Sequence, residues 1–164
     1  MLSDHIGSAI VTHFKETPTK GQEELIRLLS EFVVSSGRRD LFLIRGYAGT
    51  GKTSVIAAFV AAIRMLKIRS VLLAPTGRAA KVMSSFTHSP AFTIHKKIYR
   101  QKSSKDGFGN FSLNVNLHTD AYFIVDEASM IANMSNEQNI FGSGQLLNDL
   151  LEFCLLYTSS SDTL

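Results

Sequence analysis

The sequence predicts an α/β fold in which a parallel sheet carries helices on both faces. Three apolar runs have the length and composition of buried strands, at residues 41–44, 70–74 and 121–125. Helical patterns separate these runs, and buried strands that alternate with helices are typical of parallel sheets. A glycine-rich loop directly follows the first run, so we expect a binding site at the carboxyl ends of the strands.

The elements before and after the first run are helical. A short leading helix is expected over residues 6–14, and Pro18 ends it. Thr19 and Gln22 form the pattern T-x-x-Q, a capping box that predicts the start of a second helix, and apolar positions at helical spacing continue to Val33. Ser35-Ser36-Gly37 should end that helix. Apolar positions between residues 55 and 66 predict a third helix after the glycine loop.

The later elements follow from turn residues and periodicity. Pro75 ends the second strand, and a short helix is expected over residues 78–82. Residues 101–110 form a polar loop, and residues 111–117 alternate between apolar and polar, which predicts a half-buried strand and a hairpin insert over 101–117. Residues 133–143 are polar, and leucines near residue 150 predict a last helix. We expect one domain over residues 1–153 and a tail, disordered or non-native, over 154–164.

Composition bounds the class of protein. The chain has 164 residues, of which 45% are hydrophobic, enough for one folded domain. The net charge of +3 permits a nucleic-acid partner without requiring one. Cys154 is a single cysteine, which fits a reducing compartment, and no apolar run reaches the length of a membrane span. We therefore expect a cytoplasmic protein with no membrane partner.

One motif specifies a ligand. Eight consecutive residues match the phosphate-loop pattern G-x-x-x-x-G-K-[ST]: Gly46, Tyr47, Ala48, Gly49, Thr50, Gly51, Lys52 and Thr53. A glycine loop that opens a helix directs several backbone N–H groups and the positive end of the helix dipole at one point. Lys52 adds a side-chain cation for the β- and γ-phosphates. The motif predicts a nucleoside triphosphate site, with ATP as the expected cofactor.

A second motif supplies the remaining chemistry. Asp126 and Glu127 directly follow the third apolar run. Mg²⁺ prefers oxygen ligands, so Thr53 and Asp126 are the expected metal ligands, directly or through water. Glu127 is the expected catalytic residue that orients and deprotonates the attacking water, together with Lys52 as catalytic cation.

The motifs together resemble those of superfamily 1 DNA helicases of the RecD and Dda type. The resemblance rests on four segments in the family's order, namely residues 46–53, 74–80, 93–96 and 125–130, and extends from about Thr17 to Leu151. It implies a RecA-like fold and an N-terminal ATPase domain that moves 5′ to 3′ on single-stranded DNA. The motifs of a second RecA-like domain are missing here, so the resemblance implies an incomplete motor that binds nucleotide without unwinding DNA.

The resemblance also assigns residues that the phosphate loop does not. Gln22 matches a glutamine that contacts the adenine, beside its role as a helix cap. Contacts to DNA fall on Pro75, Thr76, Gly77, Thr93 and His95. For Thr76 a plain helix cap is the alternative, and for His95 a purely structural role is equally expected. The hairpin insert lies where relatives carry a hairpin that splits the duplex.

Two other classes of function remain open at this point. A small phosphate-loop kinase would share the first motif, but its lid normally carries arginines, and the chain has none between Ala128 and Leu164. A nucleotide-binding module that hydrolyses nothing would share both motifs. Measurement of ATP turnover with and without single-stranded DNA separates the three classes.

Overall fold

The computed structural model of the chain describes residues 1–35, 40–101, 111–118, 120–131 and 141–155. The helices are α1 (Leu2–Thr12), α2 (Lys20–Ser35), α3 (Lys52–Met65), α4 (Gly77–Thr87), α5 (Ile94–Ile98), the 3₁₀ turn η1 (Ala128–Met130) and α6 (Leu146–Leu155). The strands are β1 (Arg69–Ala74), β2 (Ala91–Thr93), β3 (Tyr99–Gln101), β4 (Phe111–Leu113) and β5 (Ala121–Val125).

A three-stranded parallel sheet lies at the centre, with strand order β2-β1-β5. Leu73 pairs with Val125 and Ala74 pairs with Thr93, so all three strands end at the same edge. The backbone N–H of Asp126 donates to the carbonyl of Leu73 at 3.1 Å and extends the pairing by one residue. This edge holds the residues that the sequence singled out after the second and third predicted strands.

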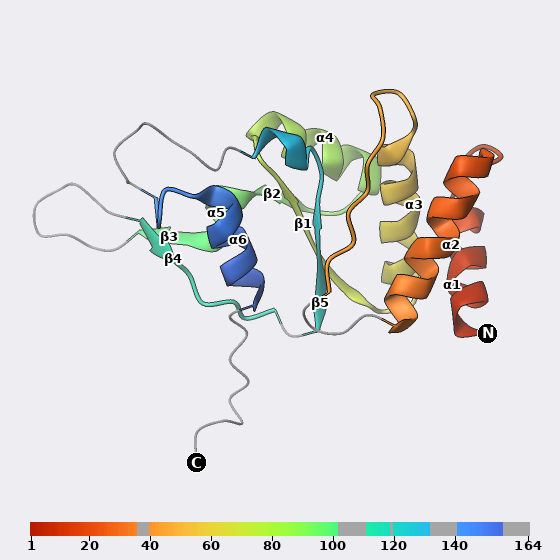
Figure 1. Ribbon diagram of the computed structural model, residues 1–164, viewed down its shortest axis with the longest axis horizontal. Coiled ribbons are helices and arrows are strands. Elements are labelled where there is room, and N and C mark those ends of the chain that lie inside the picture. Colours follow the sequence, from red (N-terminus) through yellow and green to blue (C-terminus); the bar gives the residue numbers. More distant parts are fainter. Residues whose placement is uncertain (36–39, 102–110, 119, 132–140, 156–164) are drawn as a thin grey trace, which may run out of the picture.

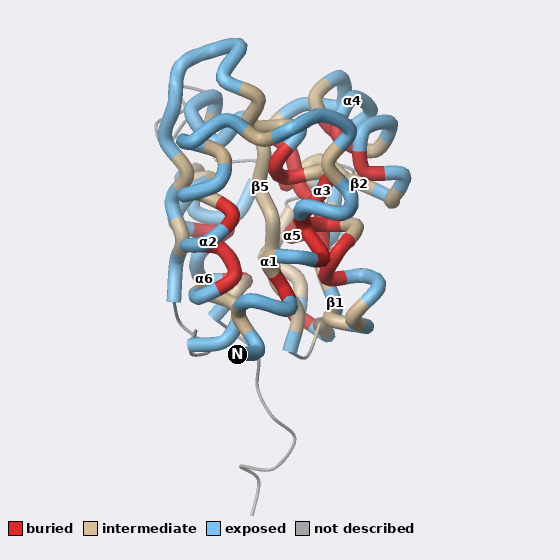
Figure 2. Tube along the Cα trace, turned by 90° about the vertical axis from the view of Figure 1, so that its right-hand side faces the viewer, coloured by how far each residue is buried: buried red, intermediate tan, exposed pale blue. Residues whose placement is uncertain are grey.

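Helices cover both faces of the sheet, as predicted (Figure 1). Helices α1, α2 and α3 pack through one apolar cluster that includes Ile10, Leu29 and Phe59, and α4 joins that side through Met83. On the other face, α5 and α6 pack against β1 and β5 through a cluster that includes Ile94, Leu150 and Phe153. The buried positions concentrate on α3 and on the inward sides of its neighbours (Figure 2).

The predicted buried strand at residues 41–44 is wrong. Residues 40–46 run in an extended path beside β5 (Figure 1), but no strand is assigned to them. Phe42 and Ile44 pack against the cluster of α1, α2 and α3, while Leu41 and Leu43 are 76% and 67% exposed. The run is apolar throughout, but only alternate side chains meet the core.

The third strand of the sheet is therefore one that the sequence did not predict. Strand β2 has only three residues, and its burial is intermediate. A three-residue run is too short to show a period, so its pairing with β1 sets its conformation. The predicted strands at 70–74 and 121–125 are confirmed as β1 and β5.

The predicted strand over residues 111–117 is correct only at its start. Strand β4 ends at Leu113 and pairs antiparallel with β3, with Arg100 opposite Ser112, so a hairpin base is present. Beyond it, the Asn116 side chain accepts from the backbone N–H of His118 at 2.9 Å, and Leu117 is 82% exposed. A local turn therefore replaces the strand. Residues 102–110 and most of 133–143 lie outside the described residues.

The helices agree better with their sequence signals. Helix α1 begins earlier than predicted, α2 begins directly after Thr19, and α6 covers the expected leucines. None of the helices in the described ranges is both long enough and apolar enough to cross a membrane.

Candidate nucleotide-binding site

The glycine loop lies between the extended segment 40–46 and the first residue of α3, above that helix in Figure 1. Gly49 and Gly51 both have φ of +78°, a left-handed conformation that side chains with a Cβ atom rarely adopt. Gly51 is the N-cap of α3, so the loop feeds directly into a helix N-terminus. The first N–H groups of a helix have no intrahelical acceptor and point out of its end, where an anion can meet them.

Lys52 folds back over this loop. Its ammonium donates to the carbonyls of Gly46 and Tyr47 at 2.8 and 2.7 Å. The hydroxyl of Thr50 also donates to the carbonyl of Tyr47, at 2.9 Å. The Lys52 ammonium therefore lies against the backbone of the loop, bonded to two of its carbonyls.

Gln22 joins α2 to the loop. Its side-chain oxygen accepts from the backbone N–H of Thr19 at 2.9 Å, which confirms the predicted capping box, while Thr19 accepts the return bond at 3.4 Å. Its side-chain nitrogen donates to the carbonyl of Thr50 at 3.3 Å. The sequence signalled the cap, but not the bond to the loop, which spans 28 positions.

Asp126 and Glu127 turn sharply at the end of β5. The Asp126 carboxylate accepts from the backbone N–H of Glu127 at 2.9 Å, and Glu127 has a left-handed φ of +54°. A non-glycine residue in that region is strained, and such strain concentrates at functional sites. Glu127 is exposed and is the N-cap of η1, so its carboxylate is accessible at the edge where the strands end.

The donor set fits a magnesium–nucleotide complex. A hydroxyl from Thr53 on α3 and a carboxylate from Asp126 are oxygen ligands of the kind that Mg²⁺ takes, alongside phosphate oxygens and waters. Among the described residues, no three His, Cys, Asp or Glu side chains gather into a metal site of their own.

Comparison with protein families places the chain. The model of the AAA domain family matches residues 18–140. The chain belongs to this AAA domain family. The match spans α2, the glycine loop, the sheet and the Asp126–Glu127 turn, so the site just described lies within a P-loop ATPase domain. No solved structure matches the chain.

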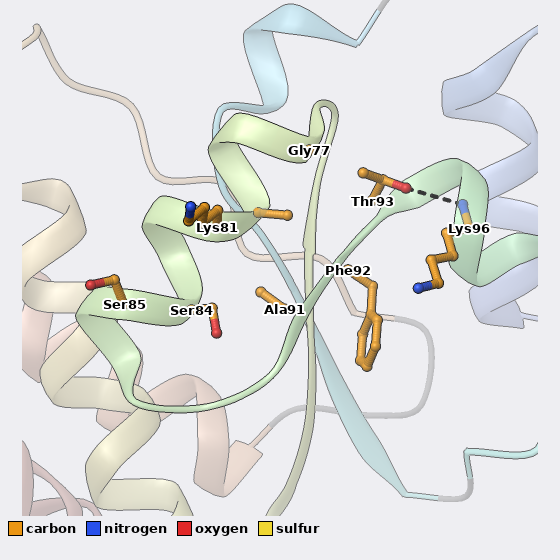
Figure 3. A pocket seen from close by; sticks show the side chains of 9 residues that line it. Gly77, Lys81, Ser84, Ser85, Ala91, Phe92, Thr93 and Lys96 are labelled. Atoms are coloured by element: carbon orange, nitrogen blue, oxygen red, sulfur yellow. Dashed lines mark hydrogen bonds between the residues drawn. The ribbon is translucent and has the colours of Figure 1, made fainter.

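This AAA domain carries a groove beside its sheet edge (Figure 3). The groove has a volume of about 520 Å³ and lies between α4 and the β2–α5 junction. Its lining combines lysines, hydroxyls and one aromatic ring: Gly77, Ala80, Lys81, Ser84, Ser85, Ala91, Phe92, Thr93 and Lys96. Lys97 places its ammonium 5.0 Å from the centre of the Phe92 ring, so a further cation lies next to the groove.

The residues expected to contact DNA divide between the groove and its surroundings. Gly77 and Thr93 line it, and Pro75 and Thr76 directly precede it at the end of β1. Thr76 caps α4 by accepting from the backbone N–H of Ala79 at 3.2 Å, so the cap role is confirmed. Thr93 likewise caps α5, accepting from the N–H of Lys96 at 3.2 Å. Both hydroxyls keep a hydrogen to donate.

His95 lies in a cluster of aromatic rings. Its ring is 5.7 Å from Tyr99 and 5.2 Å from Phe141, measured between ring centres. Burial lowers the pKa of His95, so a neutral imidazole is favoured there. A contact between His95 and DNA stays a prediction, and a packing role accounts for its present neighbours.

The sequence missed two groove residues, Phe92 and Lys96. Each looks ordinary alone, since a single aromatic and a helical lysine are usually structural or solvated. What places them together is the parallel pairing of β2 with β1. The sequence signals were the position of Phe92 directly before Thr93 and that of Lys96 inside the segment 93–96.

A second polar cluster lies on the opposite side of the sheet from α3. Asp149 of α6 is 4% exposed, and its carboxylate accepts from the Tyr99 hydroxyl at 2.6 Å and from the Ser143 hydroxyl and N–H at 2.6 and 3.0 Å. Burial alone would raise the pKa of Asp149, but the bonds from Ser143 and Tyr99 outweigh it and lower that pKa. Gly142 lies against the same carboxylate, with a left-handed φ of +50° and no room for a Cβ atom.

Proposed function

We propose that this AAA domain binds Mg·ATP and hydrolyses it to move along single-stranded DNA, as the N-terminal motor half of a 5′ to 3′ helicase. The observation that carries the proposal is the shared edge. The Asp126–Glu127 turn, Thr76 at the start of α4 and Thr93 at the start of α5 follow three paired strands that end together. Nucleotide chemistry and a cationic groove would then be coupled through one sheet.

The nucleotide site supplies defined roles. Residues 46–51 would surround the phosphates with backbone N–H groups, and Lys52 would neutralise the β- and γ-phosphates. Mg²⁺, held by Thr53 and Asp126, would supply positive charge to the γ-phosphoryl oxygens. Glu127 would accept the proton of the attacking water. A contact between Gln22 and the adenine edge stays a prediction from the resemblance.

The groove supplies a surface for single-stranded nucleic acid. Lys81 and Lys96 offer charges for phosphates, and the half-buried Phe92 ring, with the Lys97 ammonium 5.0 Å from its centre, would offer its exposed part to a base. Thr76 and Thr93 add hydroxyls at helix starts, a common way to hold a phosphate. Charge together with an aromatic platform favours single strands over duplexes.

The proposal also includes a second RecA-like domain as partner. Phosphoryl transfer builds negative charge on the γ-phosphoryl oxygens, and an arginine finger that meets it is worth ~10³–10⁵ in rate. We propose that the partner domain supplies this arginine. The 164-residue chain alone should therefore hydrolyse ATP at less than about 1 s⁻¹ and should not unwind DNA. A cytoplasmic location is part of the same proposal.

Fluorescence anisotropy with a labelled single-stranded oligonucleotide tests the DNA half of the proposal. The double variant Lys81→Ala, Lys96→Ala should bind more weakly than wild type, and its affinity should depend less on salt. The slope of log affinity against log salt should fall by about 1 to 2, because each lysine on a phosphate contributes about one unit or slightly less.

Lys15→Ala, Lys67→Ala is the matched control, because this double variant removes the same two charges from exposed lysines outside the groove. Its affinity and salt slope should equal those of wild type. If both variants weaken binding equally, net charge rather than the groove holds the DNA. If the groove variant leaves binding unchanged, the assignment of the groove is wrong.

A further inference from the structure

Gln22 makes two hydrogen bonds that fix how its amide is turned. The N–H of Thr19 can only donate and the carbonyl of Thr50 can only accept, so the side-chain oxygen must face Thr19 and the nitrogen must face Thr50. The chemistry of the partners therefore assigns the two ends of the amide without ambiguity.

The same amide lies against the last glycine of the loop. A Cβ atom on Gly51 would collide with the side-chain nitrogen of Gln22, and Gly51 has a left-handed φ of +78°. Gln22 thus bonds the carbonyl of Thr50 and fills the space where a side chain on Gly51 would lie. Both observations concern the Thr50–Gly51 step, and Gly51 is the N-cap of α3.

Holding this carbonyl orients the next N–H group. A trans peptide is planar, so its C=O and N–H point in opposite directions. With the Thr50 carbonyl turned toward α2, the N–H of Gly51 is turned away from α2. A polyphosphate bound by loop N–H groups depends on such orientations, and an amide that can flip binds an anion less tightly.

We propose that Gln22 is a positioning residue for the phosphate loop, which it sets through the Thr50 carbonyl whatever base the nucleotide carries. The proposal rests on the phosphate site of the proposed function and deepens it. It differs from a contact with adenine, which would use the second N–H and the second lone pair that the Gln22 amide keeps beside its bonds to Thr19 and Thr50. A role through the Thr50 carbonyl acts on the phosphates and requires no base.

The test compares a ligand without a base with one that has a base. Isothermal titration calorimetry would measure the affinity of wild type and of Gln22→Met for magnesium tripolyphosphate and for Mg·ATP. Methionine has a similar length and shape but cannot donate to Thr50. We expect both affinities to fall by about the same factor, roughly fivefold, the value of one hydrogen bond.

Two further variants keep the result specific. Thr19→Ala weakens the cap of α2 without touching the bond to Thr50, so its tripolyphosphate affinity should match wild type. Gln22→Asn keeps an amide that is one methylene shorter and cannot reach Thr50, so it should behave like Gln22→Met. Equal losses in Thr19→Ala and Gln22→Met would show that stability of α2 is responsible, and would overturn the proposal.

The remaining outcomes separate this inference from the function on which it rests. If wild type binds both ligands and Gln22→Met loses affinity for Mg·ATP alone, Gln22 contacts the base and the inference is wrong. If wild type binds neither ligand, the phosphate site itself is wrong, and the inference fails with it.

Discussion

Two loops of this domain have similar local structure and opposite electrostatic character. Residues 46–51 lead into α3, and residues 141–145 lead into α6. Each contains two glycines with a left-handed backbone, Gly49 and Gly51 in the first loop and Gly142 and Gly144 in the second. Both place left-handed glycines ahead of a helix N-terminus, where backbone N–H groups can meet an anion.

The second loop holds an anion of its own. Asp149 reaches back from the first turn of α6 and accepts from both the N–H and the hydroxyl of Ser143. Tyr99 completes the set from the hairpin base, and Phe141 stacks on Phe111 with 4.5 Å between ring centres. A carboxylate of the chain thus takes the hydrogen bonds that Ser143 of this loop donates.

The first loop carries a cation instead. Lys52 donates to the loop carbonyls of Gly46 and Tyr47, and Tyr47 is 88% exposed. The comparison shows that glycines before a helix do not suffice for a ligand site. The sign and origin of the nearest charged side chain decide whether the loop stabilises the fold or remains open to a polyphosphate.

The largest effect should come from removing Asp149, which holds the second loop, residues 141–145. Asp149→Ala removes three hydrogen bonds to a buried carboxylate and leaves the Tyr99 and Ser143 donors without an acceptor. We expect the free energy of unfolding to fall by about 3 kcal/mol, since each unsatisfied buried polar group costs about 1–3 kcal/mol. Urea unfolding followed by circular dichroism would measure it. An unchanged midpoint would mean that the cluster contributes nothing to stability.

A change in the cation of the first loop, residues 46–51, should affect Mg·ATP binding rather than the stability of the fold. Lys52→Ala should weaken Mg·ATP binding by about 2 kcal/mol, or roughly thirtyfold, because a charge-assisted contact is lost. The free energy of unfolding should change by less than about 0.5 kcal/mol, as is usual for accessible sites. Calorimetric titration and urea unfolding of one preparation would give both values, and equal affinities would contradict the assignment of the phosphate loop.

A smaller change at the second loop should lower the free energy of unfolding by a smaller amount. Tyr99→Phe keeps the ring contact with Phe141, 5.5 Å between centres, and removes one hydrogen bond to Asp149. The expected loss is about 1.5 kcal/mol, the lower end for a bond to a charged group. If Tyr99→Phe costs as much as Asp149→Ala, the ring packing rather than the carboxylate holds the loop.

Low pH should reduce the contribution of Asp149 to the free energy of unfolding. Hydrogen bonds hold the pKa of Asp149 below its ordinary value of 3.8 in the folded state. The stability linked to this shift is present above the ordinary value and is lost as pH falls through the folded value. The difference in unfolding free energy between wild type and Asp149→Asn should therefore be constant near neutrality and smaller at about pH 3. A difference that grows in acid would reverse the sign.

The sequence was sufficient where the signal is local. The phosphate-loop motif, the capping box of Thr19 and Gln22, and the position of Asp126 and Glu127 after β5 each depend on a few consecutive residues, and each lies where the pattern indicates. The prediction of a buried strand at residues 41–44 was wrong, because an apolar run does not show whether one or both faces of the segment pack against other elements.

Contacts between distant segments could not be predicted. The bond from Gln22 to Thr50 and the bond from Tyr99 to Asp149 join positions 28 and 50 residues apart. Neither bond can be inferred from the residues near either partner in the sequence. Phe92 and Lys96 likewise gained significance only after β2 paired with β1 and brought them to the groove beside α4.

Hydrogen–deuterium exchange with and without Mg·ATP tests the comparison most directly, because both loops are followed in one experiment. The account predicts slower exchange for the amides of residues 46–53 when Mg·ATP is added, and no change for residues 141–145. Protection of residues 141–145 with no change at 46–53 would contradict the assignment of the first loop as the nucleotide site.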